Sequence, residues 1–246
     1  MTTIADIMQT LNEFAPPETA QKWDNCGLLV GSPVTEVTKA LVTLDITLTA
    51  VAEARRIGAQ LIVSHHPVIF RPLSVLKSGE PVYELAAAGI AAGAAHTNLD
   101  ICDGGVGCCL SAALELTNVR DTAEPFVKVG ELPVEMTPEQ FAKHTAACLK
   151  TAVRLHSGNA PIQTVAVGGG SCGEFARVAE AAGAQAFVSG EIRHHEYINE
   201  PMTLIEAGHY ATEQPVIPSL CARLAAQHPS IEWHAFDIGE PYTTVM

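Results

Sequence analysis

Three short apolar runs in this chain each lead directly into a motif rich in histidine and carboxylate. The motifs are Ser64-His65-His66-Pro67, His96-Thr97-Asn98-Leu99-Asp100 and Gly208-His209-Tyr210-Ala211-Thr212-Glu213. Apolar runs of this length are typical of buried strands, and ligands of open α/β sheets collect at the carboxyl ends of strands. One fold can therefore bring all three motifs together at the carboxyl ends of its strands.

Strand and helix patterns alternate along the whole sequence. Strands are expected at 39–45, 60–66, 125–132, 151–157, 164–169, 186–190, 203–208 and 231–238. Helices are expected at 48–57, 81–92, 137–150, 173–184 and 209–227. This alternation predicts an α/β fold with mainly parallel or mixed sheets. No long linker interrupts residues 1–246, so we expect a single unit of two closely packed lobes, approximately 1–124 and 125–246.

Composition narrows the classes of function. The chain of 246 residues carries a formal net charge of −13 with only 14 Lys and Arg, which argues against a direct nucleic-acid partner. No apolar stretch is long enough for a transmembrane helix, and the N-terminus lacks the basic region of a signal peptide. The seven cysteines are odd in number and include no C-x-x-C pair, which favours a reducing cytoplasm.

His65 and His66 stand where a strand is expected to end. Consecutive strand residues point to opposite faces, so two adjacent ligands require the backbone to have left the strand. Pro67 favours this because it restricts the conformation of His66. Each imidazole can then serve a different metal ion. The alternative is a pair of loop histidines without any ligand role.

The other two motifs add a nitrogen and two carboxylates. Asp100 offers oxygen atoms that can bridge two cations. His209 and Glu213 are four residues apart, which places both side chains on one face at the start of a helix, although a surface polar pair has the same spacing. Three imidazoles and two carboxylates are too many ligands for one tetrahedral ion and suit two bridged divalent ions. The expected metal ligands are thus His65, His66, Asp100, His209 and Glu213.

Further candidates surround this set. His96 either ligates a metal or acts beside it, and His194 in Gly190-Glu191-Ile192-Arg193-His194-His195-Glu196 has either a catalytic or a structural role. The loop Gly168–Gly173 joins a strand to a helix and either holds an anion or is only a tight turn. It lacks the lysine of a P-loop and the full Rossmann fingerprint.

Taken together, these motifs resemble the type 2 GTP cyclohydrolase I homologues, also called Nif-three-like proteins. The resemblance spans nearly the whole chain. It rests on WDNCGLLVG (23–31), LDIT (44–47), SHHPVIF (64–70), HTNLD, GGV (104–106), GEIRHHE and AGHYATE (207–213). It implies a two-lobed α/β fold, a toroidal homohexamer, and five metal ligands at the positions named above. The chain matches the compact form of the family, which lacks a long central insertion, and Ile101-Cys102-Asp103 departs modestly from the usual pattern.

The family label implies attack of water at C8 of guanine, opening of the imidazole ring and loss of formate. Two divalent ions (Zn, Fe or Mn) suit the first step, and His96 and His194 are candidates for proton transfer. Arg71, Lys77 and Arg193 are candidate contacts for a triphosphate.

Three hypotheses follow: a metal-dependent hydrolase of a nucleotide-like small molecule, a metal-handling or interaction protein, and a phosphoester hydrolase. Open coordination positions favour an enzyme, whereas the scarcity of basic residues weighs against a triphosphate specialist.

Overall fold

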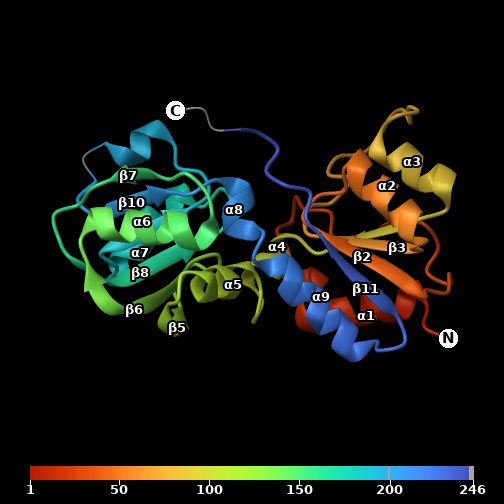
Figure 1. Cartoon of the computed structure of the whole chain (residues 1–246), viewed down its shortest axis with the longest axis horizontal. Coiled ribbons are helices and arrows are strands. Elements are labelled where there is room, and N and C mark those ends of the chain that lie inside the picture. Colours follow the sequence, from red (N-terminus) through yellow and green to blue (C-terminus); the bar gives the residue numbers. More distant parts are fainter. Residues whose placement is uncertain (199, 244–246) are drawn as a thin grey trace. The chain divides into compact units, whose positions relative to one another are not determined.

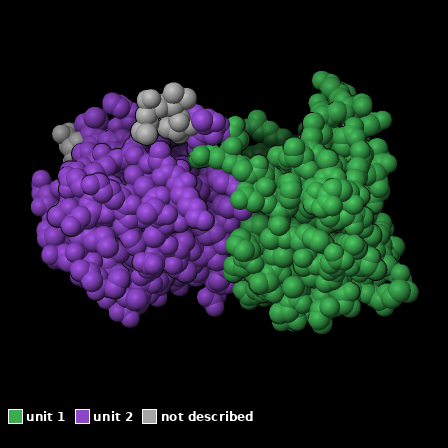
Figure 2. All heavy atoms as spheres, viewed as in Figure 1, with its two compact units in different colours: residues 1–102, 217–241 green, residues 103–216, 242–246 purple. Residues whose placement is uncertain are grey.

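The computed structural model describes residues 1–198 and 200–243, and the chain divides into two compact units. Unit 1 comprises Met1–Cys102 and Ile217–Pro241, and unit 2 comprises Asp103–Val216 and the chain from Tyr242 on. Figure 2 distinguishes the two units by colour. Each unit contains its own sheet.

The sheet of unit 1 has five strands in the order β1-β4-β3-β2-β11. Their bounds are β1 (Gly27–Val30), β2 (Lys39–Thr43), β3 (Leu61–Ser64), β4 (Ala91–Ala94) and β11 (Glu232–Phe236). Only β1 runs antiparallel to its neighbour, and the other three pairings are parallel. The carboxyl ends of β2, β3, β4 and β11 therefore meet at one edge.

Helices cover both faces of this sheet. They are α1 (Ile4–Phe14), η1 (Pro17–Thr19), α2 (Leu48–Ile57), α3 (Pro81–Ala88), α4 (Thr97–Ile101) and α9 (Val216–Gln227). On one face, Leu41, Ile62 and Ala92 of the strands pack with Val51 of α2 and Leu85 of α3. Figure 1 shows α1 and α9 on the opposite side of the sheet. Thr47 caps α2 by accepting a hydrogen bond from the backbone of Ala50, as expected for this threonine.

The sheet of unit 2 has six strands in the order β5-β6-β8-β9-β10-β7. Their bounds are β5 (Thr117–Asp121), β6 (Lys128–Met136), β7 (Arg154–His156), β8 (Ile162–Gly168), β9 (Ala186–Ser189) and β10 (Thr203–Glu206). The pairings β8–β9 and β9–β10 are parallel, and the remaining three are antiparallel. The sheet is mixed, which agrees with the predicted α/β class.

Alternation along the strands of unit 2 builds two cores. Val165 and Val167 face a cluster that includes Phe141 of α6, whereas Ala166 between them faces a cluster that includes Ala179 of α7. The helices of unit 2 are α5 (Val106–Ala113), α6 (Pro138–Leu149), η2 (Gly173–Phe175), α7 (Ala176–Ala181), η3 (His194–Tyr197) and α8 (His209–Glu213). A capping box of Thr137 and Gln140 starts α6, which confirms the expected helix start.

Three expected helices differ from their predicted bounds. The helix expected at 173–184 consists of η2 and α7 and ends at Ala181. The helix expected at 81–92 ends at Ala88, because Gly89 adopts a left-handed conformation (φ 66°) and its N–H caps the helix. The following residues form β4 instead. The helix expected at 209–227 is divided into α8 and α9. Pro215 stands at the break, where it cannot donate the next helical hydrogen bond.

The two units also differ from the expected halves 1–124 and 125–246. The last strand, β11, pairs in parallel with β2, and this returns residues 217–241 to unit 1. At the other boundary, β5 pairs with β6, so residues 103–124 belong with the second sheet. Among the described residues, every helix is too short or too polar to cross a bilayer.

Candidate metal centre

The candidate ligands lie in two groups, one in each unit. In unit 1, β3 ends at Ser64, so His65 and His66 follow the strand as the sequence predicted. Their backbone N–H groups still bond to the carbonyls of Thr43 (3.2 Å) and Leu44 (2.9 Å). The two imidazole centroids are 4.8 Å apart, which brings both rings to the same place at the sheet edge.

His96 and Asp100 reach the same edge from the next strand. His96 lies between β4 and α4, and its carbonyl accepts the backbone N–H of Asp100 at 2.9 Å. His65, His66 and His96 each offer a ring nitrogen within 4.8 Å of the other two. Oδ1 of Asp100 lies 3.5 Å from Nε2 of His65, whose side chain is fully buried. Unit 1 therefore brings together four of the residues predicted from sequence.

Unit 2 contributes the second group. Gly208 precedes α8 with a φ of 84°, and the helix then places Nε2 of His209 3.1 Å from Oε1 of Glu213. The loop Gly168–Gly173 packs against this pair: a Cβ on Gly170 would collide with Oε1 of Glu213 and approach Nε2 of His209 to 3.2 Å. Gly170 therefore makes room for the two candidate ligands, whereas the sequence alone left the role of this loop open.

Each of the four histidines directs Nδ1 at an oxygen acceptor. The pairs are His65 with the carbonyl of Ala95 (3.1 Å), His66 with Asp45 (2.8 Å), His96 with Asp24 (2.9 Å) and His209 with Glu191 (2.7 Å). A carbonyl or carboxylate oxygen only accepts, so each Nδ1 carries the proton. The lone pair of the neutral ring is then on Nε2, the arrangement found in most histidines that ligate metals.

The donor set fits divalent cations. Nε2 of His65 faces Asp100, and Nε2 of His209 faces Glu213, so in each pair a lone pair meets a carboxylate oxygen. A divalent ion held between the two atoms would remove the repulsion between the lone pair and the carboxylate. Ligands about 2.1 Å from a shared ion stand roughly 3.0–3.4 Å apart at tetrahedral or octahedral angles, close to the observed 3.5 and 3.1 Å. Mixed imidazole and carboxylate ligands suit Zn, Fe and Mn.

The carboxylates behind the histidines were not predicted as site residues. The side chain of Asp24 is fully buried, which opposes ionisation, but hydrogen bonds from His96 and Thr97 outweigh this and hold the pKa of Asp24 below its usual value. The pKa of Glu191 is lowered first by a hydrogen bond from Ser171, against burial, and further by His209. Both carboxylates remain anionic at neutral pH, so they fix the orientation of the two rings.

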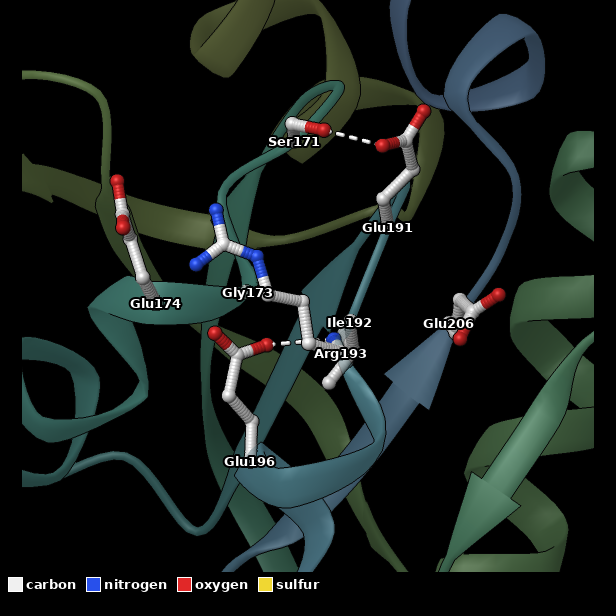
Figure 3. A pocket seen from close by; sticks show the side chains of 8 residues that line it. All are labelled: Ser171, Gly173, Glu174, Glu191, Ile192, Arg193, Glu196 and Glu206. Carbon is white, nitrogen blue, oxygen red and sulfur yellow. Dashed lines mark hydrogen bonds between the residues drawn. The ribbon is translucent and has the colours of Figure 1, made fainter.

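Glu191 lines a cavity of about 190 Å³ in unit 2. Figure 3 shows its carboxylate beside Ser171, with Arg193, Glu196 and Glu174 at other parts of the wall. The sequence does single out Glu191, because it follows β9 and Gly190 directly and belongs to the motif that contains His194. His194 itself begins η3 with an exposed side chain, and no other described residue forms a hydrogen bond with it.

Cys26 lies beside the first group without the properties of a ligand. Burial raises the pKa of its thiol to about 11. Its S–H donates to Oδ1 of Asn98 at 3.1 Å. The thiolate form that binds metals is therefore scarce at neutral pH.

Comparison with known proteins shows which family this sequence resembles. The model of the Duf34/NIF3 (NGG1p interacting factor 3) family matches residues 2–241. A GTP cyclohydrolase 1 type 2 homolog of Streptomyces coelicolor is 34% identical over 97% of this chain and 90% of its own length. One from Lactococcus lactis is 36% identical over 84% and 86%. The crystal structure of Staphylococcus aureus protein SA1388 superposes with a TM-score of 0.90 at 27% identity, covering 99% of both chains.

Proposed function

The chain belongs to the Duf34/NIF3 family, and on that premise we propose that it is a hydrolase that uses two divalent ions to act on a nucleotide-like small molecule. His65, His66 and Asp100 of unit 1, together with His209 and Glu213 of unit 2, hold the ions in this proposal. Neither group alone supplies enough ligands for two ions.

The observation that carries the proposal is the common orientation of the histidine rings. Four rings from two sheets all use Nδ1 for an oxygen acceptor and keep the lone pair on Nε2. Three of the four acceptors are carboxylates, whose charge strengthens each imidazole as a donor to a cation. A set of surface or core histidines has no reason to share this arrangement.

If bound by these five residues, divalent ions would supply Lewis acidity for the activation of water. The chain's own residues supply orientation and proton transfer. His96 is fixed by Asp24, so its Nε2 accepts a proton and the buried carboxylate stabilises the resulting imidazolium. His194 is the second candidate for proton transfer, from the exposed start of η3.

The substrate proposed by name is GTP, because the Streptomyces and Lactococcus relatives are named GTP cyclohydrolase 1 type 2 homologs. Water adds at C8 of guanine, the imidazole ring opens, and a second water releases C8 as formate. Arg71, Lys77 and Arg193 are the cations proposed to meet the triphosphate. The net charge of −13 makes the metal ions the main source of positive potential in the site.

The proposal includes a toroidal homohexamer in a reducing, cytoplasmic setting. The chain has seven cysteines, an odd number with no C-x-x-C pair, which supports such a compartment. Light scattering on the eluted protein tests the assembly: a mass of six chains is expected, and a monomer or dimer at micromolar concentration would contradict it.

The activity is tested with protein loaded with Zn, Mn or Fe and incubated with GTP. Formate and a pterin-type product are expected, in amounts that depend on the metal. Phosphate released without formate would instead identify a phosphoester hydrolase. Loaded protein that is inert toward nucleotides and phosphoesters would contradict the proposal and favour a metal-handling or interaction protein.

A further inference from the structure

Two large aromatic side chains surround His96 on the surface of unit 1. The ring centroids of Trp23 and Phe70 are 5.7 Å apart, and each lies 6.2 Å from the imidazole of His96. The interplanar angles are 59°, 72° and 80°, so no two of the three rings stack face to face. None of these contacts is a parallel stack, so a planar ligand can still stack on a ring face that the other two rings leave open.

Both aromatic residues are exposed to an unusual degree. Trp23 is 59% exposed and Phe70 is 44% exposed. An indole with that exposure cannot have both faces covered. Exposed aromatic rings that gather beside a site are typical of ligand-binding surfaces.

Hydrogen bonds hold the loop that carries Trp23. The carboxylate of the next residue, Asp24, accepts from the backbone N–H of Thr97 (3.0 Å), from its hydroxyl (2.5 Å) and from Nδ1 of His96 (2.9 Å). The side-chain amide of Asn25 donates to the carbonyl of Ile69, which adjoins Phe70. Hydrogen bonds thus hold the backbone next to both rings in place. A ligand that stacks on the rings therefore pays little entropy for ordering the loop.

The aromatic pair adjoins the candidate ligands of unit 1. The imidazole of His96 lies 5.2 Å from that of His65 and 5.4 Å from that of His66, measured between centroids. A ring bound against Trp23 and Phe70 is therefore separated from the metal ligands by a single imidazole. That imidazole is the one assigned to proton transfer.

We propose that Trp23 and Phe70 form the binding site for a planar heteroaromatic ring of the purine type, which stacks on the open face of the indole. This inference rests on the proposed function and specifies how the substrate is held. Stacking on an aromatic side chain recognises any base by its π-face, and His96 at the edge of the pair supplies a polar contact. Arg71 follows Phe70 with an exposed side chain, and no described carboxylate pairs with it, so a phosphate on the same ligand has a cation close by in the chain.

Equilibrium dialysis of the metal-loaded full chain with guanosine 5′-monophosphate tests the stacking site. Trp23→Leu should weaken binding about tenfold, because it removes the π-face and keeps an apolar side chain. Trp23→Phe should retain most of the affinity. Equal affinity of W23L and the parent protein would overturn the inference, as would equal losses in W23L and W23F.

Fluorescence provides a second measurement that does not depend on turnover. The chain has two tryptophans, and Trp233 is a half-buried residue of β11. In Trp233→Phe, the nucleotide should quench the emission of Trp23 in a saturable way, whereas ribose 5-phosphate, which lacks the base, should not. Equal quenching by both compounds would overturn the inference.

Failure of the stacking site and failure of the proposed hydrolase give different results. Saturable quenching of Trp23 without formate release supports the site and contradicts the activity. Formate release that is unchanged in W23L supports the activity and overturns the site. Trp23 could instead be buried when copies of the chain associate. A mass in solution that differs between W23L and the parent protein, with equal nucleotide binding by the two, would therefore also overturn the stacking site.

Discussion

Nδ1 of His209 lies 2.7 Å from Oε1 of Glu191, and the other oxygen of Glu191 accepts a hydrogen bond from Ser171. This relationship fixes the ring of one candidate ligand through a residue that is not itself a candidate ligand. The same arrangement recurs in unit 1, where Asp45 fixes His66 and Asp24 fixes His96. In both sheets, a carboxylate thus binds Nδ1 of a histidine and leaves Nε2 available to a ligand.

Glu191→Gln should lower metal affinity about 10- to 100-fold, because the neutral amide no longer strengthens His209 as a donor. Competition with a chromogenic chelator measures the change. Glu174→Gln is the matched control, since Glu174 lines the same cavity with an exposed side chain and makes no hydrogen bond with His209. Equal affinities of the two variants would show that Glu191 does not act through the ring.

Gly170→Ala should cost both stability and metal affinity. Gly170 has a φ of 61°, and an added Cβ would collide with Glu213. Gly183→Ala separates the two effects, because Gly183 has a φ of 86° and open space around its Cβ position. Urea unfolding should show a loss of about 1–2 kcal/mol in G183A from backbone strain alone, with unchanged metal affinity. A larger loss and weaker metal binding are expected in G170A, and identical behaviour of the two variants would contradict the packing role of the loop.

Asp24→Asn should destabilise the metal-free protein by about 2–3 kcal/mol at pH 7, because charge-assisted hydrogen bonds to a buried carboxylate are lost. The pKa of Asp24 is lower in the folded chain than in the unfolded chain. Its contribution is therefore complete above the unfolded pKa of about 3.9 and disappears as the pH falls through the folded value.

Unfolding free energies measured in chelator at pH 7 and in steps below pH 4 test this account. The difference between parent and D24N should shrink at the acidic end. Glu18→Gln, at an exposed carboxylate of η1, should leave stability unchanged throughout. A difference that stays constant across the range would mean that Asp24 contributes through packing and not through its charge.

The sequence was sufficient to locate the histidines because their signal is local. A strand followed by His65 and His66, or by His209 after Gly208, can be read from a few consecutive residues. The pairing of Asp24, Asp45 and Glu191 with their histidines could not be predicted in this way, since the partners are 72, 21 and 18 residues apart in the sequence. Such contacts depend on how loops from different strands converge in the fold. The hydrophobic periodicity of the sequence does not predict this convergence.

The errors in the fold prediction have equally specific causes. The alanine-rich segment after residue 81 has the composition of a helix, but Gly89 ends it and β4 pairs with β3. The division into halves failed to follow the sheets because β11 pairs with β2 at the far end of the chain. Long-range strand pairing overrode the local pattern in both cases.

The central proposal is that two ions per chain are held by His65, His66, Asp100, His209 and Glu213. Plasma emission spectrometry on gel-filtered protein counts the ions per chain in the parent, in His65→Ala from unit 1 and in Glu213→Ala from unit 2. Two ions are expected in the parent, and stoichiometric binding should be lost in each variant because each removes a ligand from a shared centre. Retention of two ions per chain in either variant would contradict the claim.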